Sequence, residues 1–312
     1  MTRYPCPQMT LGGPVSFNGV GLHSGCQVAM TIHPAPPGTG IVFRRSDLDG
    51  FPIEATAAHI ANVSYATTLM KKGVLVSTVE HVLSALRGYG VDNAFIDVDD
   101  MEVPILDGSA VPLLDAFDRV GLATQPAPRR TLRILREVHH ELGDKLITAS
   151  PSDRLEVTYL IDFPHPLIGR MERTYVPTPD VYRRELAPCR TFGFIREISQ
   201  LKENGLIKGG SLDNAVVFSD TAVLNPGGLR FPDEFIRHKV LDFLGDLALV
   251  GMPVIGRFFA ARAGHGIHAA LVRKILANPA NATIETDSSD APPVTFRPPA
   301  VDLRAPALQP AP

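Results

Sequence analysis

The sequence has no tryptophan, few cysteines and no excess of charge of either sign. Its three cysteines, Cys6, Cys26 and Cys189, are odd in number and widely spaced. This pattern excludes a disulfide framework and a closely spaced thiolate zinc site, and it favours a reducing compartment. With 30 basic against 33 acidic residues, the net charge is −3. A strongly basic nucleic-acid surface and a disordered polyelectrolyte are therefore excluded, so no nucleic-acid partner is expected.

Long apolar segments are missing as well. The most apolar stretch, residues 244–261, is interrupted by Asp246, Pro253 and Arg257. It therefore falls short of the ~18 uninterrupted residues of a membrane span. The first 17 residues have one arginine but no apolar run of the kind found in signal peptides. We expect a cytoplasmic protein without a transmembrane segment, which approaches a membrane only transiently.

The length and the spacing of the predicted elements indicate two domains. A chain of 312 residues accommodates about two domains of ~150 residues each. Residues 125–130 have the composition of a linker. Strands and helices are grouped within each half rather than alternating regularly, which favours an α+β class. We expect two similar-sized α/β sandwiches, residues 1–126 and 127–277, with helices on mixed or antiparallel sheets and the active site between them.

The remaining residues, 278–312, are rich in proline. Eight of the 28 prolines of the chain lie there, and apolar periodicity is lost. This composition predicts an extended or disordered tail.

Four helices are predicted from apolar spacing and end signals. The first starts near Ser77 and stops at Gly88, and the second covers residues 111–123. The third runs from Pro232 to about Val250, and the last covers residues 268–277.

The third helix has a narrow polar stripe on a largely apolar surface. At ~100° per residue, His238, Lys239, Asp242 and Asp246 fall within an arc of about 100°. His238 and Asp242, four residues apart, can reach one metal ion from a single face. The alternative is a simple histidine–aspartate hydrogen bond on a solvated stripe. Unpaired burial of the carboxylates would be costly, so we expect a metal, lysine or histidine partner.

Two further segments carry candidate reactive groups. Ser77 to His81 reads STVEH, in which Glu80 and His81 are either a base beside a metal ligand or parts of a capping box to Ser77. His265 lies between two glycines, where it is either a proton donor on flexible backbone or an ordinary loop histidine. The glycine-rich residues 19–25 lack the spacing and the ending of a phosphate-binding loop, so nucleotide hydrolysis there is rejected.

Together, these segments resemble one family. The matching stretches lie between residue 19 and about residue 275 and read GVGLHSG, ATTL, STVEH, DNAFIDV, EVPILDGSA, RTFGF, GLIKGGSLDNAVVF, VLNPGGLRFPDEFIRHKVLDFLGDLALVG and AGH. In this order they closely resemble the UDP-3-O-acyl-N-acetylglucosamine deacetylases, the zinc amidases of lipid A biosynthesis in Gram-negative bacteria. The resemblance implies hydrolysis of the substrate's acetamide to acetate and a free amine.

The resemblance also implies the roles of individual residues. One catalytic Zn²⁺, or Fe²⁺ in its place, would be bound by His81, His238 and Asp242, with an open position for water. Glu80 would be the general base, and His265 the acid or oxyanion stabiliser. Asp246 would orient His265, and Thr191 would donate to the oxyanion.

The substrate implied by the resemblance is a UDP-linked acylated glucosamine. Phe192 would stack on the sugar ring, and Lys239 would contact the diphosphate. An insert at about residues 194–217 would form the acyl passage, with Phe194, Ile198, Leu201, Ala215 and Val217 as wall residues; ordinary core packing is the alternative for these five. His23 and the turn at residues 107–109 match family motifs without an assigned step.

The chain departs from the family after His265. An Ala-Leu-Asn run is common there, whereas this chain has Gly266-Ile267-His268. From the 312 residues we expect no fused dehydratase domain, and we expect a monomer. Two other functions stay open at this point: a zinc deacetylase for another acylated sugar, and a non-catalytic binding protein stabilised by zinc.

Overall fold

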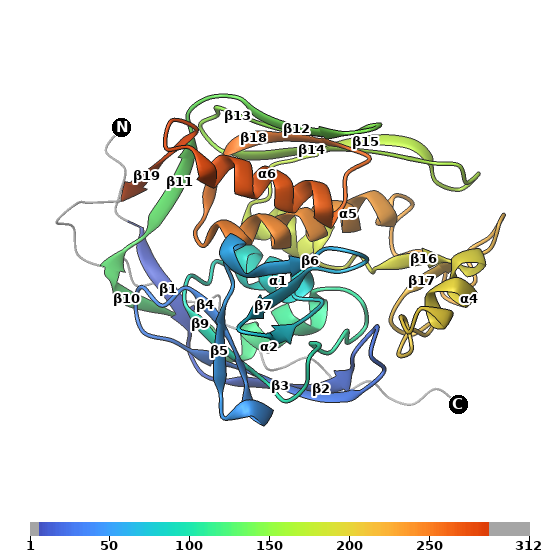
Figure 1. The fold of residues 1–312 in the computed structure, drawn as a ribbon, viewed down its shortest axis with the longest axis horizontal. Helices are drawn as coiled ribbons and strands as arrows, with labels where there is room; N and C mark the ends of the chain where they lie inside the picture. The colour runs from blue at the N-terminus through green and yellow to red at the C-terminus, as the bar shows by residue number, and fades with distance from the viewer. Residues whose placement is uncertain (1–5, 287–312) are drawn as a thin grey trace, which may run out of the picture.

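The computed structural model describes residues 6–286 in layers of sheet, helix, helix and sheet (Figure 1). One outer layer is a five-stranded sheet with the order β2-β3-β9-β4-β5. Its strands are β2 (Val15–Val20), β3 (Gln27–Pro34), β9 (Ala94–Val98), β4 (Ile41–Arg45) and β5 (Phe51–Glu54). Helices α1 (Glu80–Tyr89) and α2 (Val111–Val120) lie on its inner face.

The opposite outer layer is a seven-stranded mixed sheet. β18 (Val254–Ala261) is central, pairing parallel with β11 (Arg130–Ile134) and β14 (Leu155–Phe163) and antiparallel with β13 (Lys145–Ser150). The outer strands are β12 (Val138–Leu142), β15 (Gly169–Tyr175) and β19 (Ala282–Thr286). Helices α5 (Glu234–Leu247) and α6 (His265–Ala277) cover its inner face and meet the helices of the other sheet (Figure 1).

Smaller elements complete the described chain. β6 (Ile60–Asn62), β7 (Thr68–Lys71) and β8 (Val74–Val76) form a three-stranded sheet. β16 (Phe192–Phe194), α4 (Ile195–Glu203) and β17 (Val216–Phe218) form an insert at the side of the molecule (Figure 1). Short helical turns are α3 (Pro179–Val181), a π-turn (Tyr182–Leu186) and 3-10 turns at Ser46–Leu48, Ala57–His59 and Ala248–Val250.

The mixed and antiparallel sheets confirm the α+β class. The division into two domains stays a prediction, because the buried apolar side chains form one continuous cluster from Leu11 to Ile275. β10 (Leu122–Pro128) crosses the predicted boundary at residue 126 and pairs antiparallel with β1 (Pro7–Leu11). The predicted tail contains a strand, since β19 pairs antiparallel with β11. Residues 287–312 of that tail lie outside the described residues.

Three predicted helix ends were wrong. α1 continues past Gly88 to Tyr89, because Gly90 adopts the left-handed conformation (φ 97°) that ends it. α2 ends at Val120 instead of residue 123. α6 begins at His265 rather than residue 268, because the amides of Ile267 and His268 already bond to the Gly264 carbonyl. The third predicted helix is α5, which starts at Glu234, two residues after Pro232.

A close crossing of α1 and α5 brings the two halves of the chain together. At Gly245 of α5, a Cβ atom would lie 2.0 Å from the carbonyl oxygen of Glu80. Only glycine permits so close an approach. The crossing therefore places the start of α1, with Glu80 and His81, beside the polar stripe of α5. Among the described residues, no helix is both long and apolar enough to cross a bilayer.

Candidate metal centre and active site

Three side chains from α1 and α5 converge at the crossing. Asp242 Oδ1 lies 3.1 Å from His238 Nε2 and 3.5 Å from His81 Nε2. The two imidazole rings meet edge to face, with centroids 4.9 Å apart. His81, His238 and Asp242 are all buried, and their ligand atoms lie within 4.8 Å of one another. The sequence prediction placed these three residues together, and the structure does so.

The hydrogen bonds around this group fit a metal ion. His238 Nδ1 lies 3.0 Å from the carbonyl oxygen of Cys189, so it carries the proton and leaves Nε2 free as a ligand. Asp242 Oδ1 is buried without a hydrogen-bond partner among the described residues. A buried acceptor without a donor is unfavourable unless a cation satisfies it. Two imidazole nitrogens and one carboxylate oxygen are also the donor set of an open catalytic zinc site.

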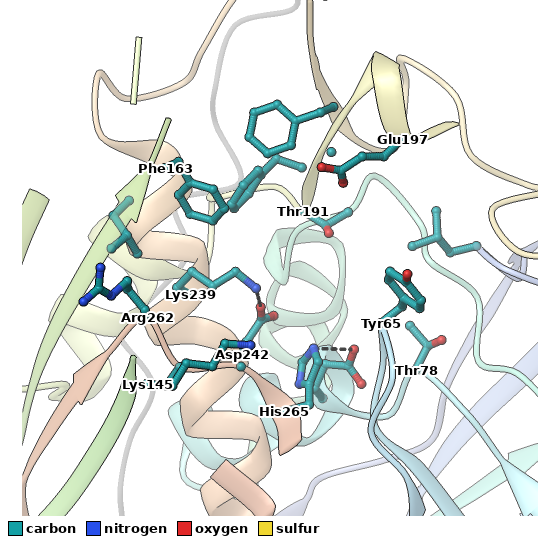
Figure 2. A pocket seen from close by; sticks show the side chains of 18 of the residues that line it. Tyr65, Thr78, Lys145, Phe163, Thr191, Glu197, Lys239, Asp242, Arg262 and His265 are labelled. Atoms are coloured by element: carbon teal, nitrogen blue, oxygen red, sulfur yellow. Dashed lines mark hydrogen bonds and ion pairs between the residues drawn. The ribbon is translucent and has the colours of Figure 1, made fainter. Parts of the chain in front are cut away.

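The other oxygen of Asp242 is paired with Lys239. Lys239 Nζ donates to Asp242 Oδ2 at 2.8 Å (Figure 2). Although burial opposes ionisation, His238 and Lys239 hold the pKa of Asp242 well below its usual range. Burial likewise opposes the charge of Lys239, but Asp242 raises its pKa. Both groups are therefore charged at neutral pH. The solvated histidine–aspartate pair is excluded as the explanation of the stripe because His238 and Asp242 are buried.

Glu80 lies beside this group and does not form a capping box. Its Oε2 accepts from the amide of Thr67 at 3.0 Å, while Ser77 Oγ bonds to Thr68 Oγ1. The capping-box interpretation is wrong, because Glu80 is bonded to Thr67, Ser77 is bonded to Thr68 of β7, and the two are not bonded to each other. Burial raises the pKa of Glu80, with His265 and His81 opposing the shift. A raised pKa makes the carboxylate a stronger base near neutral pH.

His265 is held by Asp246 at the first position of α6. Its Nδ1 donates to Asp246 Oδ2 at 2.7 Å, and its Nε2 lies 3.7 Å from Glu80 Oε1. Burial opposes the charged form, but Asp246 and Glu80 together raise the pKa of His265 to about 9. Burial also works against the Asp246 carboxylate, yet His265 and His268 lower its pKa to about 2. His265 is therefore an imidazolium at neutral pH rather than an ordinary histidine on a flexible loop.

An ion pair of the neighbouring Arg190 holds the turn that presents Thr191 to the site. The Arg190 amide and guanidinium both donate to Glu234 Oε1 at 2.9 Å, which fixes the turn against the start of α5. The backbone of Thr191 bonds to Gly108 and Val216. Its side chain lines the same cavity as His265 and Asp242 (Figure 2).

The cavity over the metal ligands has a volume of about 560 Å³. Its walls include His81, Asp242, Glu80, His265, Thr191, Phe192 and Lys239, which were predicted. They also include Lys145 and Arg262, which were not. Figure 2 shows these two cations on the same side of the pocket as Lys239. Lys145 begins β13 and Arg262 directly follows β18, so both lie at strand ends of the seven-stranded sheet, where the local sequence pattern gave no sign of a site.

A second, more apolar cavity adjoins the first. Its volume is about 430 Å³, and it shares Thr191, Phe192 and Phe194 with the first cavity. Every residue predicted for the acyl passage lines it: Phe194, Ile198, Leu201, Ala215 and Val217. The insert therefore lines an apolar space that adjoins the cavity at the candidate metal ligands.

The glycine-rich loop at residues 19–25 binds a carboxylate of the protein itself. The amides of His23 and Ser24 donate to the buried Glu102, which also accepts from Thr78 Oγ1 at 2.7 Å. These amides are thus occupied, in agreement with the rejection of a phosphate-binding loop. Glu102 was missed as a positioning residue, although it opens the quoted segment EVPILDGSA. It ties His23, which lines both cavities, to the residues before Glu80.

Three partners of the His265 pair were also missed. Thr67 Oγ1 donates to Asp246 Oδ1 at 2.5 Å, and His268 Nδ1 to Asp246 Oδ2 at 2.8 Å. Tyr159 in turn contacts His268. The ATTL segment and the departure at His268 were visible signals for the first two, whereas Tyr159 looks like any other strand residue in the sequence.

Comparison with known proteins agrees with this geometry. A family model described as UDP-3-O-acyl N-acetylglycosamine deacetylase matches residues 8–277. A UDP-3-O-acyl-N-acetylglucosamine deacetylase from Solibacter usitatus is 47% identical over 272 residues, covering 87% of this chain and 92% of the relative. Those from Anaeromyxobacter dehalogenans and Neisseria meningitidis serogroup A are 45% and 44% identical, over 95% and 91% of this chain and 96% and 95% of theirs.

The match covers every residue of the site. Glu80, His81, Thr191, the polar stripe of α5 and His265 all fall within residues 8–277. The chain therefore belongs to the UDP-3-O-acyl N-acetylglycosamine deacetylase family, as the resemblance of its motifs predicted.

Proposed function

We propose that this chain is a zinc-dependent amidase that hydrolyses the acetamide of UDP-3-O-acyl-N-acetylglucosamine, a step of lipid A biosynthesis. The observation that carries the proposal is the convergence of His81, His238 and Asp242 beside a carboxylate and an imidazolium. A structural zinc site needs neither a base nor a proton donor. The enzyme is thus favoured over a zinc-stabilised binding protein.

His81, His238 and Asp242 would hold the metal through two Nε2 atoms and Oδ1. When bound there, the ion polarises the acetamide carbonyl and lowers the pKa of a water molecule. Zinc is the proposed occupant, and Fe²⁺ is the alternative that this donor set also accepts. The partly buried Lys239 ammonium balances the second oxygen of Asp242, which keeps Oδ1 directed at the imidazoles.

Glu80 would take the proton from the attacking water. Its carboxylate is adjacent in sequence to a metal ligand and lines the cavity. The Thr67 amide holds Oε2, so Oε1 is the oxygen directed at His265 and the cavity. Attack then forms a tetrahedral carbon whose oxygen carries negative charge.

His265 would complete the reaction as the acid. Asp246 holds Nδ1, so the proton on Nε2 is the one that can reach the leaving nitrogen. The C–N bond breaks as this proton moves to the amine, and acetate leaves with the oxygen of the water. Thr191 is the proposed hydrogen-bond donor to the negative oxygen before the bond breaks.

The cavity supports the two ends of the proposed substrate differently. Lys239, Lys145 and Arg262 line one side of the first cavity and would donate to a diphosphate there, in place of part of the present pairing of Arg262 with Asp144 and Asp162. Phe192 stands between the cavities, where its ring can lie against the sugar. Phe194, Ile198, Leu201, Ala215 and Val217 then surround the acyl chain in the adjoining apolar cavity.

The proposal is tested by turnover of the acylated UDP-sugar after metal removal and reconstitution. Removal should abolish acetate release, and one equivalent of Zn²⁺ should restore it, with Fe²⁺ compared in parallel. Free UDP should compete with the substrate. If UDP does not compete, the enzyme acts on another acylated sugar; if no metal restores turnover, the amidase proposal fails.

The cytoplasmic location and the monomeric state remain predictions of the sequence. Fractionation of the expressing cells tests the first. Sedimentation of the purified, metal-loaded protein tests the second.

A further inference from the structure

A second histidine lies one turn after His265 in α6 and is not used by the proposed mechanism. His268 is fully buried, with 0% of its surface exposed. It lines neither the cavity over the metal ligands nor the adjoining apolar cavity. Any influence of His268 on the reaction must therefore pass through the residues that it touches.

The first of these residues is Asp246. His268 Nδ1 donates to Oδ2 at 2.8 Å, and His265 Nδ1 donates to the same oxygen at 2.7 Å. Thr67 Oγ1 donates to Oδ1. The carboxylate is thus held by three donors from two segments of the chain, α6 and the residue before β7, and two imidazoles share one of its oxygens.

The far side of His268 is also held. The Tyr159 hydroxyl lies 3.0 Å from His268 Nε2 and 2.8 Å from the carbonyl oxygen of Ala263, two residues before His265. The Phe243 ring packs edge to face on His268, with centroids 5.1 Å apart. The His268 side chain therefore contacts β14 and α5, and Tyr159, which donates to Ala263, joins this point to the segment that leads into His265.

We propose that His268 is a positioning residue, which holds the Asp246 carboxylate towards His265 and thereby sets the orientation and the proton affinity of His265. The inference rests on the role proposed above for His265. It gives a function to the Gly266-Ile267-His268 segment, in which this chain departs from the common family pattern.

The charges around His265 fix the direction of the effect. Glu80 of α1 and Asp246 and Asp242 of α5 favour the imidazolium. His23 and His268 face it as well, and burial lowers the pKa of both, so they are neutral at neutral pH. As a neutral donor on Oδ2, His268 competes with His265 for the same oxygen. Loss of His268 should strengthen the hydrogen bond between Asp246 and the His265 imidazolium. It should also leave the position of the Asp246 side chain less well fixed.

The experiment follows His265 directly by NMR of zinc-loaded enzyme labelled with ¹⁵N in its imidazoles, with His265→Gln used to assign the signal. In His268→Leu, the pKa of His265 should rise by about 0.5–1 unit. The kcat should fall about tenfold, because His265 is misaligned. The KM should stay within about twofold of the wild-type value, because the substrate contacts are unchanged. His268→Asn keeps an N–H donor for Asp246 and should restore both values to near wild type.

Tyr159→Phe provides a second variant that barely changes the core. It removes the hydroxyl that contacts His268 Nε2 and donates to the Ala263 carbonyl, and it should move the His265 pKa in the same direction by less. Tyr182→Phe, which loses a buried hydroxyl bonded to Ser84, should leave His265 unchanged. The inference is overturned if His265 titrates as in wild type in both Tyr159→Phe and a folded, zinc-loaded His268→Leu. The role of His265 as the acid is tested separately. If His265→Gln turns over at the wild-type rate, His265 is not the acid, and the NMR result on His268 still stands.

Discussion

At the scale of single residues, the site depends on charges that are buried and yet kept ionised. Asp242 and Asp246 stand one helical turn apart on α5 and are each 2% exposed. Desolvation of two carboxylates costs several kcal/mol each unless they are paired. Lys239 and His238 offset this cost for Asp242, and His265, His268 and Thr67 do so for Asp246. The two aspartates thus have separate partners, which fits separate tasks.

Glu80→Gln should reduce kcat by about 100- to 10,000-fold, because the amide cannot accept the proton of the attacking water. The fold should survive, since the glutamine oxygen still accepts from the Thr67 amide. The measurement is acetate release together with zinc content, which should stay at one ion per chain. Glu197→Gln is the matched control: this exposed carboxylate lines both cavities and should be dispensable for kcat. Near wild-type turnover in Glu80→Gln would remove Glu80 from the role of base.

The alkaline side of the pH–rate profile should report His265. Its pKa is raised to about 9, so the imidazolium predominates below that pH and is lost above it. An acid that must be protonated then gives a kcat/KM that falls about tenfold per pH unit beyond about pH 9. Replacing Asp246 by Asn removes the main stabilising charge and should move this limb to lower pH. A limb that stays in place in Asp246→Asn would mean that another group controls it.

At the scale of elements, the crossing of α1 and α5 decides whether the ligands meet. Gly245→Ala places a methyl group 2.0 Å from the Glu80 carbonyl oxygen, so the helices must separate. We expect a loss of stability of about 1–3 kcal/mol from overpacking, despite the helix propensity that alanine adds. The kcat should fall about 100-fold, because a shift of about 1 Å misplaces Glu80 and His81. Urea unfolding and acetate release measure the two effects.

Gly227→Ala is the control for this substitution. A Cβ at Gly227 has open space around it, so stability and kcat should both stay at the wild-type level. If Gly245→Ala behaves like Gly227→Ala, the close approach of the two helices does not limit the geometry of the site.

The sequence predicted the elements of the site better than their surroundings. Helical periodicity is local, so the stripe of His238, Asp242 and Asp246 could be placed on one face before any contact was known. The contacts of Asp246 with Thr67 and Tyr159's contact with His268 join distant segments, and no local pattern encodes them. The helical start at His265 was missed because flanking glycines usually mark a loop; here the Gly264 carbonyl accepts the first helical bonds.

At the scale of the whole molecule, the site lies where two sheet-and-helix layers face each other. α1 carries the proposed base and one proposed ligand, whereas α5 and α6 carry the other proposed ligands and the proposed acid; Figure 1 shows these three helices between the sheets. The insert with β16, α4 and β17 adds the apolar cavity at the side. The reaction geometry therefore depends on the layers staying in register, and elements far from the site contribute by fixing the sheets beneath the helices.

β19 is such an element, and deletions on its two sides should differ. It forms the edge of the seven-stranded sheet beside β11, where Glu285 pairs with Arg133. Just before it, the buried Asn281 binds the end of α6 through the Lys274 carbonyl. Deletion of residues 278–312 removes these bonds and should cost about 2 kcal/mol or more. At roughly 2–4 °C per kcal/mol for a chain of this size, Tm should fall by at least about 4 °C.

Deletion of residues 287–312 leaves β19 and every described site residue in place. The truncated enzyme should keep the wild-type kcat, KM and Tm, measured by acetate release and thermal unfolding of the zinc-loaded protein. Lys274 and His265 both belong to α6, so the longer deletion should also make the position of His265 less well fixed. The kcat of this variant should therefore fall as the temperature approaches its reduced Tm. A large loss of turnover in the shorter deletion would show that the proline-rich segment takes part in the reaction, and equal Tm values for the two deletions would show that β19 does not support the sheet.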